Sequence, residues 1–230
     1  MQQGTPTNID EFIQNKLNVQ NNIVKGLLGR DISKLDKNLR VLDAGCAIGN
    51  LLLYAIDRGY DSNLLYGIDI EFRLIETAKK LVKGNFTIGN IENIPFKDNS
   101  FDCIFNYDVL EHVAEPNKVI NEFNRVIQNN GFLYIRVADG YSFNDILFRI
   151  GGRILRGRSS HIQKLSKKDI IYLLESNKFI IIEDFPVKEC LLSYLPICAK
   201  IPIIGKLLLK IGSILDPYMS VAYEFKCIKR

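Results

Sequence analysis

Two glycines, Gly45 and Gly49, are the residues of this chain best suited to bind a ligand. They lie in the run VLDAGCAIGN, between an apolar segment at residues 39–43 and an apolar helical pattern at residues 51–58. Glycine permits a sharp turn and a close approach of a ligand to the backbone, and the first turn of a helix offers free N–H groups. The pattern therefore predicts a ligand-binding loop between a strand and a helix.

An acid follows this loop at a spacing suited to a ribose. Asp69 lies near the end of a second apolar segment, residues 64–70, and 20 residues after Gly49. A carboxylate at the end of the second strand of a Rossmann-type fold can accept hydrogen bonds from ribose hydroxyls. Asp69 is therefore a candidate for binding the sugar of a nucleoside ligand.

The glycine loop departs from the two common phosphate-binding patterns. A dinucleotide fingerprint has glycine at positions 45, 47 and 50, whereas this chain has Ala47 and Asn50 at two of them. A P-loop is excluded because no Gly-Lys-Ser or Gly-Lys-Thr follows. An NAD-dependent oxidoreductase is therefore disfavoured, although it stays open as an alternative.

Strand-like apolar segments alternate with helical patterns through the first part of the chain. The strand segments are 39–43, 64–70, 86–88, 101–105 and 132–137, and the helical ones are 51–58, 73–82 and 119–127. Such alternation is typical of a parallel sheet covered on both faces, and right-handed crossovers make that sheet doubly wound. Further helices are expected at 145–156 and 167–176, and further strands at 179–185 and 221–228.

We expect a single domain over residues 1–230, a length that suits one large core. Its fold class is α/β, with a Rossmann-like, doubly wound, mainly parallel sheet of seven strands, of which the last is antiparallel. A helix over residues 8–29 precedes the sheet. The apolar stretch near residues 190–216 is expected to be a lid or an interfacial insertion before the final strand.

Five segments, in the correct order, resemble the class I S-adenosylmethionine (SAM)-dependent methyltransferases, in particular the group called type 11. They are VLDAGCAIGN, YGIDI, IGNIENIPF with DNSFD, VLEHV, and VIQNNGFLY. The likeness covers roughly residues 39–137, with a weaker echo over residues 161–185. Two positions depart from the family pattern: Ala47 replaces the middle glycine of the first motif, and Asn90 stands where relatives usually have aspartate.

The resemblance implies an enzyme that transfers a methyl group from SAM to an acceptor. It implies that Asp69 holds the ribose, that Asn90 accepts from the adenine amino group, and that Ile91 supplies an apolar wall. The full set of residues implied for cofactor binding is Asp43, Gly45, Cys46, Ala47, Gly49, Asp69, Ile70, Asn90, Ile91 and Asn106.

Methyl transfer requires a base only if the acceptor must lose a proton before it attacks. The candidates for a catalytic role are His112 and Tyr141. The run DVLEH, residues 108–112, also resembles a run that binds a divalent cation in relatives that methylate ubiquinone precursors. We expect no metal here, because Leu-Glu-His-Val is common in relatives without one, and we favour a structural role near the cofactor.

Composition places few limits on location and partners. The 230 residues carry a net charge of +4, and the five cysteines are scattered without a C-x-x-C pair. This usage fits neither a disulfide framework nor a zinc site, so a cytoplasmic location is expected. The polar first residues do not resemble a signal peptide. The apolar stretch at residues 191–215 contains three lysines and two prolines, which argues against a membrane span.

Two features of the C-terminal third bear on the acceptor. Residues 146–168 contain no acid and seven lysines or arginines, and the apolar stretch 191–215 follows them. Basic charge attracts phosphate, and an apolar segment can rest on hydrocarbon. We therefore expect a lipid-linked or otherwise anionic small molecule, with peripheral membrane contact. A packed lid over a small soluble acceptor would account for the same residues.

Other functions stay open at this point. A SAM-binding regulatory module without turnover would share the cofactor motifs, and so would an RNA methyltransferase. Nucleic acid is less favoured, because only Tyr141, Phe143 and Phe148 lie near the basic run and single-stranded RNA requires aromatic stacking platforms. The sequence does not specify the acceptor, the choice among O-, N- and C-methylation, or the oligomeric state.

Overall fold

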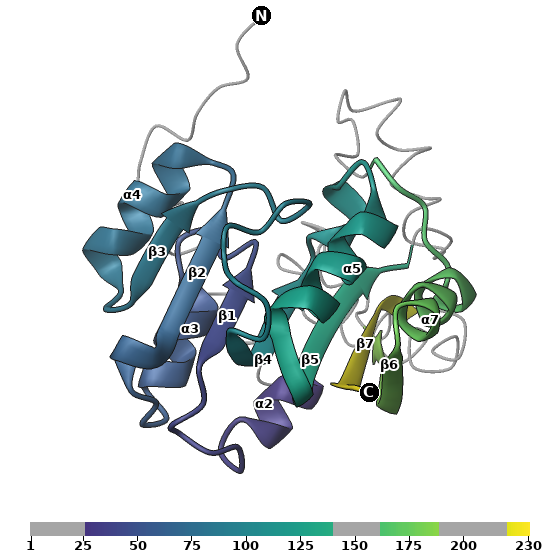
Figure 1. Cartoon of the computed structure of the whole chain (residues 1–230), viewed down its shortest axis with the longest axis horizontal. Coiled ribbons are helices and arrows are strands. Elements are labelled where there is room, and N and C mark those ends of the chain that lie inside the picture. The colour runs from purple at the N-terminus through teal and green to yellow at the C-terminus, as the bar shows by residue number, and fades with distance from the viewer. Residues whose placement is uncertain (1–25, 140–161, 189–219) are drawn as a thin grey trace, which may run out of the picture.

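The computed structural model describes residues 26–139, 162–188 and 220–230. In these ranges seven strands form one sheet flanked by helices (Figure 1). The strands are β1 (Val41–Ala44), β2 (Leu65–Asp69), β3 (Asn85–Ile88), β4 (Phe101–Tyr107), β5 (Ile127–Ala138), β6 (Phe179–Lys188) and β7 (Ser220–Lys229). The helices are α2 (Leu27–Asp31), α3 (Asn50–Ile56), α4 (Phe72–Leu81), α5 (Pro116–Val126) and α7 (Lys167–Ser176), with the 3-10 turns η1 (Ser62–Leu64) and η2 (Leu110–His112).

The strand order in the sheet is β3-β2-β1-β4-β5-β7-β6. All neighbouring pairs from β3 to β5 are parallel, whereas β7 runs antiparallel to both β5 and β6. This arrangement confirms the expected doubly wound, mainly parallel sheet of seven strands with the last one antiparallel. The strand order reverses between β1 and β4, and open α/β sheets bind their ligands at the carboxyl ends of the strands beside such a reversal.

Successive side chains of the central strands point to opposite faces of the sheet and form two apolar cores. On one face, Leu42 and Ile104 belong to a core shared with α5 and α7, which lie together in front of the sheet in Figure 1. On the other face, Val41 and Phe105 belong to a core shared with α2 and α3. Because helices cover both faces, the central strands are apolar almost throughout and hold the site-bearing loops on a rigid frame.

Local signals fix where several helices begin. Pro116 lies in the first turn of α5, where its missing N–H is not needed, and Ser166 and Asp169 form a capping box at the start of α7. The helix expected at residues 119–127 therefore begins earlier. It also ends earlier, because Ile127 pairs with Phe101 of β4 and belongs to β5.

Several expected elements lie wholly or mostly outside the described residues. They are the helix at 145–156, the insertion near 190–216 and most of the helix over 8–29. At the described end of this last segment, α2 begins after Gly26 and continues to Asp31, past the expected end at residue 29. None of the helices in the described ranges is long and apolar enough to cross a membrane.

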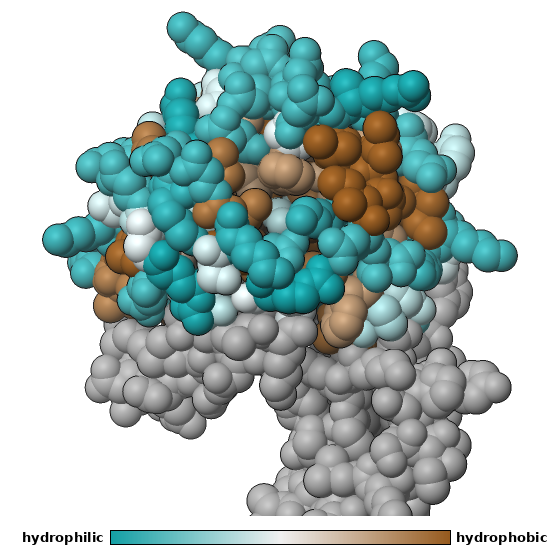
Figure 2. Space-filling view, turned by 90° about the horizontal axis from the view of Figure 1, so that it is seen from below, coloured by the Kyte–Doolittle hydropathy of each residue, from teal (hydrophilic) through white to brown (hydrophobic). Residues whose placement is uncertain are grey.

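The edge strand β6 exposes apolar side chains near its beginning. Ile180 and Ile182 are 47% and 46% exposed. Figure 2, which looks at the molecule from below the view of Figure 1, shows an apolar patch on the side of β6 within a mostly hydrophilic surface. These residues lie near the amino end of β6, so the patch is not at the carboxyl ends of the strands, where the glycine loop lies.

Candidate functional site

The glycine loop connects β1 to α3 and is tied to the neighbouring strand β2. The N–H groups of Gly45 and Cys46 both donate to the carbonyl of Ile68, at 2.8 and 3.0 Å. Gly45 and Gly49 have φ angles of +85° and +81°, in the region that favours glycine. A Cβ atom at Gly45 would also lie 2.3 Å from Val109 Cγ2, so no other residue fits there without a shift.

Ala47 occupies the position at which the family motif has its middle glycine. Its φ angle is +48°, which is left-handed for a residue that carries a Cβ atom. Its N–H donates to Asp69 Oδ2 at 2.9 Å. The loop therefore keeps a glycine-like conformation at this position, and the hydrogen bond ties it to the acid at the end of β2.

Asp69 and its neighbours form the β2 side of the site. Asp69 Oδ1 accepts from the N–H of Glu71 at 2.9 Å, so both carboxylate oxygens orient toward backbone donors. Ile70 follows and is 70% exposed. On β1, Asp43 is buried, and burial, together with the charge of Asp69, raises the pKa of its carboxyl to about 8. A neutral Asp43 can donate a hydrogen bond as well as accept one.

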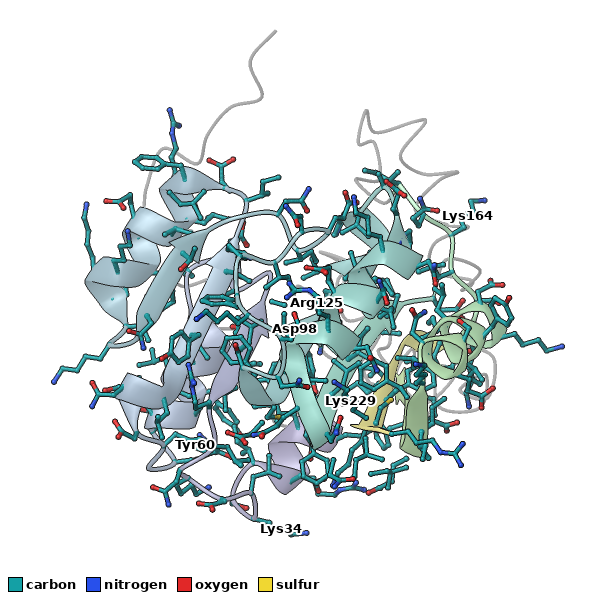
Figure 3. All side chains as sticks on the ribbon, in the orientation of Figure 1. Lys34, Tyr60, Asp98, Arg125, Lys164 and Lys229 are labelled. Carbon is teal, nitrogen blue, oxygen red and sulfur yellow. The ribbon has the colours of Figure 1, made fainter. Side chains whose placement is uncertain are left out.

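The loop between β3 and β4 carries Asn90 and Ile91. Asn90 Oδ1 accepts from the N–H of Glu92 at 2.9 Å, and Ile91 is 6% exposed. Arg125 of α5 holds the far part of this loop. Its guanidinium donates to the carbonyls of Ile94 and Phe96 and to the carboxylate of Asp98, each at 2.8 Å. Figure 3 shows Asp98 next to Arg125.

Asn106 lies near the end of β4, next to β1. Its side chain is fully buried, and its Nδ2 donates to the carbonyl of Ala44 at 2.7 Å. Within the described residues its Oδ1 has no hydrogen-bond partner. A buried acceptor left in this state is destabilising by about 1–3 kcal/mol, so this oxygen is suited to receive a donor from a ligand.

The structure therefore brings the residues implied for cofactor binding to one edge of the sheet. They lie at or just after the carboxyl ends of β1, β2, β3 and β4, around the reversal in strand order. The members are Asp43, Gly45, Cys46, Ala47, Gly49, Asp69, Ile70, Asn90, Ile91 and Asn106. Tyr141, the second catalytic candidate, lies outside the described residues.

The run from Asp108 to His112 forms the turn after β4 and the 3-10 turn η2. The carboxylate of Asp108 is paired with Arg136, Glu111 is 2% exposed, and His112 is exposed at the end of η2. Among the described residues no three histidine, cysteine or acidic side chains are grouped so as to hold a metal ion. Burial, followed by the charge of Asp108, raises the pKa of Glu111 to about 7, and its Oε1 accepts from the N–H of Ala138 at 3.4 Å.

Two buried charges near this run were not singled out from the sequence. Arg136 of β5 is 5% exposed and Glu224 of β7 is 1% exposed. In the sequence, each is the single charged residue of an apolar strand segment, which is LYIRVA for Arg136 and VAYEF for Glu224. Charged side chains are almost never fully buried without a partner, so each of them implied an opposite charge nearby.

Comparison with known proteins agrees with this geometry. A family model described as "Methyltransferase domain" matches residues 42–135. An uncharacterized protein of Methanocaldococcus jannaschii is 30% identical over 181 residues, which cover 74% of this chain and 76% of that protein. The "Ubiquinone biosynthesis O-methyltransferase" of Pelagibacter ubique is 32% identical over 51% of this chain and 49% of its own length. This chain thus spans only about half the length of some of its curated relatives.

Among solved structures, a SAM-dependent methyltransferase from Archaeoglobus fulgidus has a TM-score of 0.69, with 96% of this chain and 100% of that chain covered. At 18% identity this likeness concerns the fold. The fold and the motif match define a class I methyltransferase that uses SAM as the methyl donor. Within that class, the chain belongs to the type 11-like methyltransferase family.

Proposed function

We propose that this methyltransferase binds SAM at the carboxyl edge of β1, β2, β3 and β4, and transfers its methyl group to a small-molecule acceptor. The proposal rests on Asp69, because its carboxylate lies between the glycine loop and the start of α4. Asp69 also follows Gly49 by 20 residues, a spacing that suits the binding of a ribose. When bound, SAM supplies a methyl group activated on a sulfonium. The chain's task is to bind it, orient it and exclude water.

The donor set of SAM fits the acceptors that the edge presents. Asp69 would accept from the ribose hydroxyls, and the buried Asn106 Oδ1, which has no partner in the described ranges, would accept from the ammonium group. Ile70, just after β2, supplies exposed apolar surface, and Ile91 is the apolar residue next to Asn90 in the loop after β3. Asn90 already accepts a backbone N–H, but a carboxamide oxygen has a second lone pair for the adenine amino group.

Titration calorimetry with S-adenosylhomocysteine (SAH), the product of methyl transfer, tests this assignment without knowledge of the acceptor. Asp69→Asn should weaken SAH binding by about ten- to a hundredfold, because hydrogen bonds to a charged group are worth about 1.5–3 kcal/mol. Asp57→Asn is the matched control, since Asp57 is an exposed acid at the end of α3. Equal affinities of wild type and Asp69→Asn would contradict the assignment of Asp69.

For the acceptor, we propose a lipid-linked or otherwise anionic small molecule. Support comes from the acid-free basic run at residues 146–168 and the apolar stretch at 191–215. Part of the run contributes to the fold instead: Lys167 pairs with Asp184 at 2.8 Å. Two relatives are named for quinone biosynthesis, one as a ubiquinone biosynthesis O-methyltransferase and one as a ubiquinone/menaquinone biosynthesis C-methyltransferase.

Vesicle co-sedimentation at low and physiological salt tests the lipid side of this proposal. Anionic vesicles should bind the protein and neutral ones should not, because basic residues contribute about 1 kcal/mol each near an anionic surface. Arg153→Glu with Arg156→Glu should reduce the binding, whereas the control pair of exposed residues, Lys97→Glu with Lys118→Glu, should not. No binding at either salt concentration would leave a soluble anionic acceptor as the only form of the proposal.

A further inference from the structure

The turn after β4 lies directly on the glycine loop. Val109 packs against Gly45 so closely that a Cβ atom on the glycine would lie 2.3 Å from one of its methyl groups. The residue before it, Asp108, has a φ angle of +56°, which residues other than glycine rarely adopt. This left-handed conformation turns the chain so that Val109 meets the loop, and the surrounding structure must stabilise it.

Arg136 of β5 holds Asp108 through both main chain and side chain. The N–H of Asp108 donates to the Arg136 carbonyl at 3.0 Å. The guanidinium donates from Nε to Asp108 Oδ1 at 2.8 Å, and from Nη2 to Asp108 Oδ2. A bidentate pair of this kind fixes orientation as well as distance. The pair therefore stabilises the conformation that presses Val109 onto Gly45.

The Arg136 guanidinium has two further neighbours, Glu224 and Tyr107. Its Nη1 lies 3.9 Å from Glu224 Oε1, and its Cζ lies 5.2 Å from the centre of the Tyr107 ring. Glu224 Oε2 accepts from the N–H of Leu27, the first residue of α2, at 2.5 Å. Because Arg136 is buried among Asp108, Glu224 and Tyr107, we treat its guanidinium as the anchor of the turn.

We infer that Arg136, acting through Asp108, is a positioning residue for the cofactor: the pair holds Val109 against Gly45 and so sets the shape of the loop that receives SAM. This inference rests on the proposed cofactor site. Neither Arg136 nor Asp108 has to touch the cofactor for the effect. A residue that acted on stability alone would lower the free energy of unfolding but leave the affinity of the folded protein for SAH unchanged.

SAH titration of Asp108 variants separates the two roles. Asp108→Ala should bind SAH about tenfold more weakly than wild type. Asp108→Asn keeps the size of the side chain and the tolerance for a left-handed backbone but loses the charge. It should therefore lose less SAH affinity than Asp108→Ala. Asp184→Asn is a matched control, because its carboxylate also pairs with one cation and is 39% exposed, against 41% for Asp108. This control should bind SAH as wild type does.

Urea denaturation of the same variants measures their stability separately. If Asp108→Ala does not fold, Asp108→Asn carries the test, and a loss of affinity greater than that of Asp184→Asn supports the inference. Wild-type affinity in the folded Asp108 variants overturns it, whatever their stability. Failure of the wild-type protein to bind SAH is a different result, because it refutes the proposed function on which the inference rests.

Discussion

Ala47 shows how one residue can depart from a family motif and keep its geometry. The alanine has the left-handed φ of +48° and donates its N–H to Asp69. An L-residue in this region is less stable than glycine by about 1–2 kcal/mol. Replacing alanine with glycine also adds conformational freedom to the unfolded chain, worth about 0.4–1 kcal/mol in the opposite direction. The second effect offsets only part of the first, which leaves glycine favoured by about 0–1.6 kcal/mol.

We therefore expect Ala47→Gly to raise the free energy of unfolding by about 0–1.6 kcal/mol. Ala47→Val should lower it by more than about 1 kcal/mol, because a β-branched side chain at positive φ is strained. Urea denaturation of the three proteins measures both changes. A valine variant as stable as wild type would mean that the backbone at this position does not need the left-handed conformation.

Single residues also show which parts of the site the sequence could predict. Gly45 follows one apolar strand and Asp69 lies at the end of the next, at a spacing that itself indicates a nucleoside-type ligand, so their convergence was predictable. The pairing of Arg136 with Asp108 was not, because residues far apart in sequence meet only once β4, β5 and β7 lie side by side. A charge inside an apolar strand indicates that a partner exists, but not which residue it is.

At the scale of elements, the centres of strands and helices were more predictable than their ends. Apolar periodicity marks β1, β2 and β4 because helices cover both faces of the sheet. The ends depend on tertiary pairing. Ile127 continues the helical pattern of α5, yet it pairs with Phe101 and begins β5 instead. The loop between β3 and β4 has no periodic pattern at all, and it is held by the hydrogen bonds of Arg125 rather than by an element of its own.

At the scale of the whole molecule, stability depends on pH through three buried carboxyls of the described residues whose pKa values are raised. Burial raises the pKa of Asp43 from 3.8 to about 8, and the pKa values of Glu111 and Glu224 from 4.5 to about 7. At a pH between its unfolded and its folded pKa, each of these carboxyls keeps in the folded protein a proton that it has released in the unfolded chain. The free energy of unfolding therefore falls as pH rises from about 4.5 to about 8.

Urea denaturation of the ligand-free protein at intervals from pH 5 to pH 8 should show this decline. Glu111→Gln should decline less, because a carboxamide stays neutral throughout and one of the three groups no longer contributes. Glu175→Gln, at an exposed position in α7, should follow wild type. A wild-type stability that rises over this range would show that the three carboxyls are ionised in the folded state.

The end of β5, the end of β6 and the beginning of β7 lie side by side in the sheet. Ala138 pairs with Ala222, Lys188 pairs with Ser220, and Gly26 lies against the carboxylate of Glu224. In engineering terms, an insertion or deletion beyond these pairs would leave the register within β5, β6 and β7 unchanged, because the pairs that set it lie inside the strands.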